Sequence, residues 1–174
     1  MPVFPSFHRP DPRGTIPSVL DSGVAPTLTF LARIDVDVAA PIDLGPGDGL
    51  HRRIVPILGG RVTGPELNGT VLPGGADFQV LRSDTLTELE ARYAIETDEG
   101  DRVYVENFGL RAGSSEDIAK IVAGEPVDPS RIYFRSNPRI SSSCPKWAWL
   151  GSRILVARGE RLPESVRLEV FVVD

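Results

Sequence analysis

The sequence is short of the residues that many enzymes use for metal and nucleophilic chemistry. Its 174 residues include one cysteine, Cys144, and two histidines, His8 and His51. A zinc site needs about four ligands, so a site rich in histidine and cysteine is excluded. The glycine patterns that hold nucleotide phosphates and the Gly-x-Ser-x-Gly motif of serine hydrolases are also absent. We therefore expect neither a metal nor a cofactor.

Lysine is scarce as well. The chain has only Lys120 and Lys146, a formal net charge of −5 and a sequence pI near 5.1. Affinity for the phosphate backbone depends on clustered lysine and arginine. The composition therefore argues against a nucleic-acid partner.

The sequence also lacks the features of secreted and membrane proteins. A single cysteine cannot form an internal disulfide, and no basic segment followed by an apolar run stands at the N-terminus. No apolar stretch is long enough to span a bilayer. We expect a cytoplasmic protein with no membrane partner.

What the chain does contain is glycine and proline, 17 and 16 residues respectively, which indicate many turns and few long helices. Six of the prolines fall within residues 1–26 and rule out a helix or a central strand there. We interpret residues 1–26 as an extended N-terminal arm and residues 27–174 as one domain. The arm either lies across its own domain, contacts a neighbouring subunit in a homo-oligomer, or is a disordered tail.

Short strands dominate the rest of the chain. Apolar and polar residues alternate strictly over residues 27–38 and again over 88–97, which is typical of strands buried on one face. One short helix is expected from Ser114 or Ser115 to Ala123, and further strands are expected over 132–140, 147–158 and 166–173. Because closure removes exposed strand edges, this pattern predicts an all-β fold, a single antiparallel β-barrel with one short helix.

Several spaced segments resemble one family, the DUF3237 (UPF0311) family, over about residues 25–174. The segments are Ile54-Val-Pro-Ile-Leu-Gly-Gly, Gly69-Thr-Val-Leu-Pro-Gly-Gly-Ala-Asp77-Phe-Gln, Glu90-Ala-Arg-Tyr93, Asn107-Phe-Gly-Leu-Arg111, Tyr133-Phe-Arg135 and Trp147-Ala-Trp-Leu150. The resemblance implies a small β-barrel of the allene-oxide-cyclase or dirigent kind. It also implies a biochemical role that is largely unassigned.

The candidate site residues come from the strand alternation. Asp77 and Gln79 share one face of their strand, while Glu90 and Arg92 share one face of theirs. On the strand that carries Glu90 and Arg92, the side chain of Tyr93 points to the opposite face, and only one of the two faces can line the lumen. Our full set of candidates is Glu90, Asp77 and Tyr93 as catalytic residues, and Gln79, Arg92, Asn107, Arg135 and Trp147 as ligand-binding residues.

Three hypotheses for function follow. A carboxylate beside a guanidinium in a poorly hydrated barrel would orient a small, partly apolar carbonyl or phenolic ligand. Alternatively, Glu90, Asp77 or Tyr93 would transfer a proton in a cofactor-free isomerase, cyclase or lyase. The third hypothesis is a structural oligomer that binds no ligand, in which the arginine and carboxylate pairs only satisfy one another.

Overall fold

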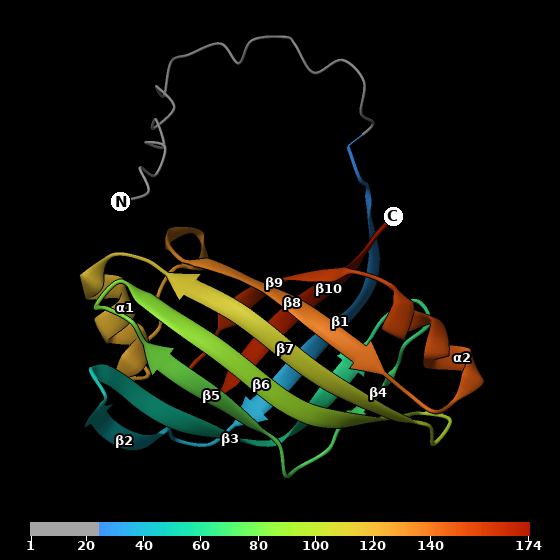
Figure 1. Ribbon diagram of the computed structural model, residues 1–174, viewed down its shortest axis with the longest axis horizontal. Coiled ribbons are helices and arrows are strands. Elements are labelled where there is room, and N and C mark those ends of the chain that lie inside the picture. The colour runs from blue at the N-terminus through green and yellow to red at the C-terminus, as the bar shows by residue number, and fades with distance from the viewer. Residues whose placement is uncertain (1–24) are drawn as a thin grey trace, which may run out of the picture.

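The computed structural model describes residues 25–174 and shows a closed antiparallel β-barrel, which confirms the predicted fold class (Figure 1). The proposed arm falls almost entirely on residues 1–24, which lie outside the described residues. The strands are β1 (Leu28–Val38), β2 (Ile42–Gly47), β3 (Leu50–Thr63), β4 (Gly69–Val71), β5 (Ala76–Leu81), β6 (Leu86–Thr97), β7 (Arg102–Ala112), β8 (Tyr133–Ser141), β9 (Leu155–Arg161) and β10 (Ser165–Val173).

The barrel is closed by pairing between β1 and β3. From β1 the order runs through β10, β9, β8, β7 and β6, and then through β4 and β5, which both pair with β3 and β6. The return from β3 to β1 includes the pair Val36 and Gly60. All of these pairings are antiparallel, and β2 is added outside the circle beside the first half of β3.

Closure requires a close approach of two backbones at Gly60. Its φ is +144°, and a Cβ atom there would lie 2.1 Å from the carbonyl oxygen of Asp35. Only a residue without a side chain fits both the dihedral angle and the space. The glycine pair at 59–60 therefore lets the long strand β3 bend towards β1.

The two helices lie at opposite ends of the barrel (Figure 1). The predicted helix is present as α1 (Ser115–Val122), capped by the side chain of Ser114 and followed by Gly124 at φ +79°. No helix within residues 25–174 is long and apolar enough to cross a membrane.

The strand predicted over 147–158 is wrong in its first half. The chain forms α2 (Pro145–Ala148) and the 3-10 turn η2 (Trp149–Ser152), and β9 begins only at Leu155. Two residues apart on a strand, the two tryptophans would share a face, but helical geometry separates them. Trp147 is buried and donates from Nε1 to Asp101 Oδ2 at 3.0 Å, whereas Trp149 is 39% exposed. The short helix thus covers one end of the barrel and closes it.

The half of the barrel nearer α2, which we call the closed half, is packed with aliphatic side chains. Ile34, Val62, Ile95, Val103 and Leu155 are almost fully buried there. Each such side chain stabilises the fold by roughly 1.5–3 kcal/mol. The other half is not packed in this way, and it contains the candidate site.

Replacing Gly60 by alanine tests the closure of the barrel. We expect Gly60→Ala to lower the free energy of unfolding by about 2–4 kcal/mol, because the new Cβ both strains the backbone and clashes with Asp35. Gly47→Ala is the matched control, since Gly47 has open space around it and no positive φ. Urea unfolding measures both variants. Equal stabilities would contradict this account of closure.

Candidate functional site

The end of the barrel near α1 is open and leads into the lumen. The lumen has a wide outer space, which we call the mouth, and a narrow inner space, which we call the inner chamber. The mouth has a volume of about 570 Å³ and the chamber about 50 Å³. Five residues line both spaces, which therefore adjoin: Val38, Val55, Gln79, Arg111 and Arg161. The last residues of α1 line the mouth.

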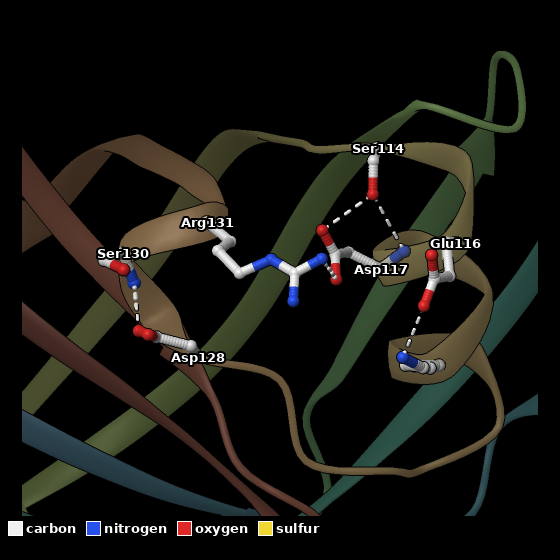
Figure 2. A network of polar contacts seen from close by, with 7 residues as sticks. Ser114, Glu116, Asp117, Asp128, Ser130 and Arg131 are labelled. Atoms are coloured by element: carbon white, nitrogen blue, oxygen red, sulfur yellow. Dashed lines mark hydrogen bonds and ion pairs between the residues drawn. The ribbon is translucent and has the colours of Figure 1, made fainter.

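A polar network fixes α1 at the mouth (Figure 2). Ser114 Oγ accepts from the backbone N–H of Asp117 at 3.1 Å and donates to Asp117 Oδ2 at 2.7 Å. Arg131 Nη2 lies 2.8 Å from Asp117 Oδ1, and the Asp117 carboxylate is buried. Arg131 ends the 3-10 turn η1 (Pro129–Arg131), which is capped by Asp128. The network therefore ties the helix to the segment that enters β8.

A row of polar side chains in the inner chamber comes from neighbouring strands. Asp77 on β5 pairs with Ala91 on β6, and Ala91 pairs with Asn107 on β7. Strands lie about 4.8 Å apart, so the small Ala91 leaves space between the two polar side chains. Ser136 on β8 lies one step away, because it pairs with Gly109. Asp77, Asn107 and Ser136 all line the inner chamber.

Asp77 is held by a chain of hydrogen bonds that begins at the mouth. Arg53 Nε donates to Gln79 Oε1 at 2.7 Å, and Gln79 Nε2 donates to Asp77 Oδ2 at 2.5 Å. Arg53 and Gln79 form a cross-strand pair between β3 and β5, which places them side by side. The chain fixes one carboxylate oxygen of Asp77 and leaves the other oxygen free.

Buried polar atoms without a hydrogen-bond partner gather in this cavity. Of eight such atoms in residues 25–174, six line the inner chamber: Asp77 Oδ1, Tyr93 OH, Asn107 Oδ1, Arg111 Nε, Arg111 Nη2 and Ser136 Oγ. A buried polar group without a partner costs roughly 1–3 kcal/mol. Their concentration in one place makes the inner chamber the candidate functional site.

Three arginines give the cavity a positive charge. Arg53, Arg111 and Arg161 have no ion pair with a carboxylate among the described residues. Burial lowers the pKa of all three, that of Arg111 to about 10, which still leaves them charged at neutral pH. Arg161 Nη1 is anchored by the backbone carbonyls of Leu162 and Ser165.

Two acidic groups face these cations. Burial raises the pKa of Asp77, and the hydrogen bond from Gln79 and the charge of Arg111 oppose the rise. Burial also raises the pKa of Tyr93, so its phenol is neutral and able to donate a hydrogen bond. The inner chamber thus holds Arg111 and Arg161 beside one carboxylate, that of Asp77, whereas the mouth adds Arg53 together with Asp37 and Glu164.

The structure brings together only part of the predicted site. Asp77, Gln79, Tyr93 and Asn107 all line the inner chamber. Trp147 does not, since it lies at the closed end beneath α2.

Glu90 and Arg92 lie on the outer surface, which corrects their placement in the lumen. The inward positions of β6 are taken by Leu89, Ala91 and Tyr93. Glu90 Oε1 and Arg92 Nη2 instead pair with each other at 2.6 Å, with side chains 53% and 52% exposed. Water solvates this pair, so it needs no ligand.

Arg135 also lies on the outer face. Its guanidinium stacks over the ring of Tyr133 at 5.3 Å from the centroid, and the two side chains alternate with the inward Phe134 and Ser136. The assignment of Arg135 to the ligand site is therefore corrected, because its side chain, like that of Arg92, points outward from the barrel.

Four residues that line the cavity were not among the predicted site residues: Arg53, Arg111, Arg161 and Ser136. Strand alternation contained the signal for Arg111, because it lies four residues after Asn107 and so on the same face of β7. Arg53 shares a face with Val55 in the same way. Arg161 carried no such signal, since it lies between the strands predicted over 147–158 and 166–173, and β9 extends to it.

The fold and the cavity place this chain among small β-barrel proteins whose lumen is open at one end and contains arginines and other polar groups. The chain belongs to the DUF3237 family, a protein family of unknown function, which matches residues 26–173. The resemblance that the sequence segments indicated is confirmed.

Relatives in this family are similar over most of their length. The UPF0311 protein RPA1785 of Rhodopseudomonas palustris is 48% identical over 145 residues, covering 83% of this chain and 92% of the relative. The UPF0311 protein CA_C3321 of Clostridium acetobutylicum is 43% identical over 142 residues, with 81% and 90% covered.

Solved structures share the fold. The crystal structure of RPA1785, a conserved protein of unknown function, matches with a TM-score of 0.81 at 41% identity, covering 87% of this chain and 99% of that one. A beta-barrel like protein (ABAYE2633) from Acinetobacter baumannii matches with a TM-score of 0.76 at 34% identity, covering 88% and 99%.

The raised pKa of Asp77 makes stability depend on pH in a direction that can be tested. Because the folded state disfavours the ionised form, the charge on Asp77 destabilises the fold at neutral pH. This penalty shrinks as the pH falls through the raised pKa, and it disappears below the ordinary value of 3.8, where both states are protonated.

We therefore expect Asp77→Asn to be more stable than the wild type at about pH 7, with the gain shrinking towards about pH 4. Thermal unfolding of both proteins at a series of pH values measures this difference in stability. Glu90→Gln makes the same chemical change on the outer face and should show no such gain. A variant Asp77→Asn that is less stable at neutral pH would refute the assignment.

Proposed function

We propose that the lumen binds a small, partly apolar carbonyl or phenolic compound that carries a negative charge, such as an aromatic carboxylate or a phenolate. The observation that carries this proposal is the set of six enclosed polar atoms without partners. Five of them belong to Tyr93, Asn107, Arg111 and Ser136, and the sixth, Asp77 Oδ1, is the free end of the Arg53–Gln79–Asp77 chain. An anion beside Arg111 would satisfy both free N–H groups of its guanidinium.

The apolar part of the ligand has its own surface. Val36, Ile57, Leu89, Phe134 and Leu168 line the same chamber as the polar atoms. Small-molecule sites combine such walls with a few convergent polar groups. We therefore expect the apolar part of the ligand to lie against these walls and its charged group to face the arginines towards the mouth.

A structural oligomer explains less of what is observed. The outer face of β7 exposes Tyr104 and Phe108, which offer apolar area to another subunit. Such an interface would leave the enclosed atoms of Asn107 and Arg111 without partners. We therefore favour ligand binding over the oligomer as the role of the lumen.

A panel of small aromatic compounds tests the proposal. We expect phenylacetate, 4-hydroxybenzoate and phenylpyruvate to bind, and the neutral phenylacetamide to bind about ten-fold or more weakly, because it offers no charge to the arginines. Isothermal titration calorimetry gives the affinities, and native mass spectrometry gives the stoichiometry. Equal affinity for phenylacetate and phenylacetamide, or binding of none of the compounds, would contradict the proposal.

Variants locate the binding site. We expect Arg111→Gln to weaken phenylacetate binding by about ten- to a hundred-fold, since a charged hydrogen bond contributes roughly 1.5–3 kcal/mol. Arg53→Gln, at the mouth, should also weaken phenylacetate binding. This variant takes the place of Arg111→Gln in the test if Arg111→Gln does not fold. Arg92→Gln removes an exposed arginine from the outer face of β6 and should change nothing. An effect of Arg92→Gln equal to that of Arg111→Gln would place binding outside the lumen.

A further inference from the structure

We propose that the lumen is also a catalytic site, in which Asp77 moves a proton to and from the carbon next to a carbonyl group of the bound anion. The activity would be a cofactor-independent keto–enol isomerisation of a small aromatic oxo acid. The inference rests on the proposed function, because the anion must first bind in the lumen. It goes beyond binding by assigning separate tasks to the side chains.

Asp77 is arranged as a base with one defined oxygen. Gln79 Nε2 holds Oδ2 at 2.5 Å, while Oδ1 is enclosed and has no hydrogen-bond partner. A carboxylate fixed at one oxygen presents the other in a constant direction, as proton transfer requires. Arg53 supports the arrangement by donating to Gln79 from the mouth.

Asp77 is the one carboxylate that lines the inner chamber among residues 25–174. Asp37 and Glu164 line the mouth instead. The raised pKa of Asp77 agrees with this role, since a base acts best when its pKa approaches the working pH. The cations that face it and limit the rise are Arg111 and Arg53.

Arg111 is placed to stabilise the negative charge that forms. Its Nε and Nη2 groups are buried, lack partners and line the same chamber as Asp77 Oδ1. Two N–H groups on one edge of a guanidinium suit an oxyanion, and donors that are fixed in advance stabilise developing charge strongly. The neutral phenol of Tyr93 is a further donor, one inward position deeper on β6.

The proposed step balances without any other reagent. Asp77 Oδ1 takes a proton from the carbon, the electrons of that C–H bond form the C=C bond, and the carbonyl π electrons move to oxygen. The enolate oxygen is held by Arg111. The protonated Asp77 then returns its proton either to the oxygen, which gives the enol, or to the carbon, which restores the ketone.

Arg53 and Arg161 account for the acid group of the proposed substrate. Arg53 lines the mouth but not the inner chamber, Arg161 lines both, and neither pairs with a carboxylate among the described residues. A carboxylate beside them leaves the carbonyl near Arg111 and the adjacent carbon near Asp77. This order of groups fits a 2-oxo acid with an aromatic end.

Hydrogen–deuterium exchange of phenylpyruvate tests the proposal. In D₂O, proton NMR follows the loss of the signal from the carbon next to the carbonyl, against a blank without protein. We expect the wild type to speed the exchange and Asp77→Asn to slow it by about a hundred-fold or more relative to the wild type. Glu90→Gln, on the outer face, should keep the wild-type rate.

Binding measured on the same samples separates the two proposals. Bound phenylpyruvate with no faster exchange would overturn the catalytic proposal and leave the binding proposal standing. Wild-type exchange in Asp77→Asn would overturn the role of Asp77. Absence of bound phenylpyruvate would overturn the catalytic proposal, and the binding proposal would fall with it if phenylacetate and 4-hydroxybenzoate also failed to bind. Slow exchange in Asp77→Asn together with unchanged affinity supports proton transfer by Asp77, because a merely structural role would also change the affinity.

Discussion

The contact between β1 and β3 at Gly60 is the constraint on which the barrel depends. Without it the sheet would be open, and the inner faces of its strands would meet water. Closure gives every strand one face towards a space of limited volume. Each inward residue must therefore either pack against others or face a cavity, and the two halves of this barrel differ in which of these they do.

In the closed half the inward side chains pack as a hydrophobic core, and in the open half they do not. Beneath α2 the inward residues are aliphatic and buried, and Trp147 satisfies its one polar atom through Asp101. Towards α1 the inward residues include Asp77, Asn107 and Arg111, several of whose polar atoms lack partners. A fold selected only for stability would replace these groups with aliphatic ones. Polar groups kept at this cost are typical of functional sites.

The fold was largely predictable from the sequence because alternation is a local signal. Residues 27–38 and 88–97 show it clearly, and each forms one strand, β1 and β6. The segment from Trp147 misled us because short apolar stretches fit a helix or a strand equally well over a single turn. There Pro145 begins a helix instead, and tertiary packing of Trp147 at the barrel end decides the outcome.

The site was predictable only in part, for a physical reason. Alternation tells which residues share a face but not which face points inward, and in β6 both faces carry polar groups, Glu90 and Arg92 on one and the Tyr93 phenol on the other. The solvated Glu90–Arg92 pair lies outside because burial of two charges costs more than burial of one neutral phenol. Partners from distant strands, such as Arg53 and Gln79, meet only through the register of β3 and β5.

The charge distribution connects the barrel to its proposed ligand. The protein as a whole carries a net charge of −5, yet Arg53, Arg111 and Arg161 gather at the lumen, and Asp77 is the one carboxylate of residues 25–174 that lines the inner chamber. An acidic surface repels anions at long range, whereas salt screens this repulsion beyond roughly 8–10 Å. Within the lumen the arginines are close and partly desolvated, so their attraction is strong and local. This arrangement favours an anion that is small and apolar enough to enter the barrel, because only such an anion reaches the charge that binds it.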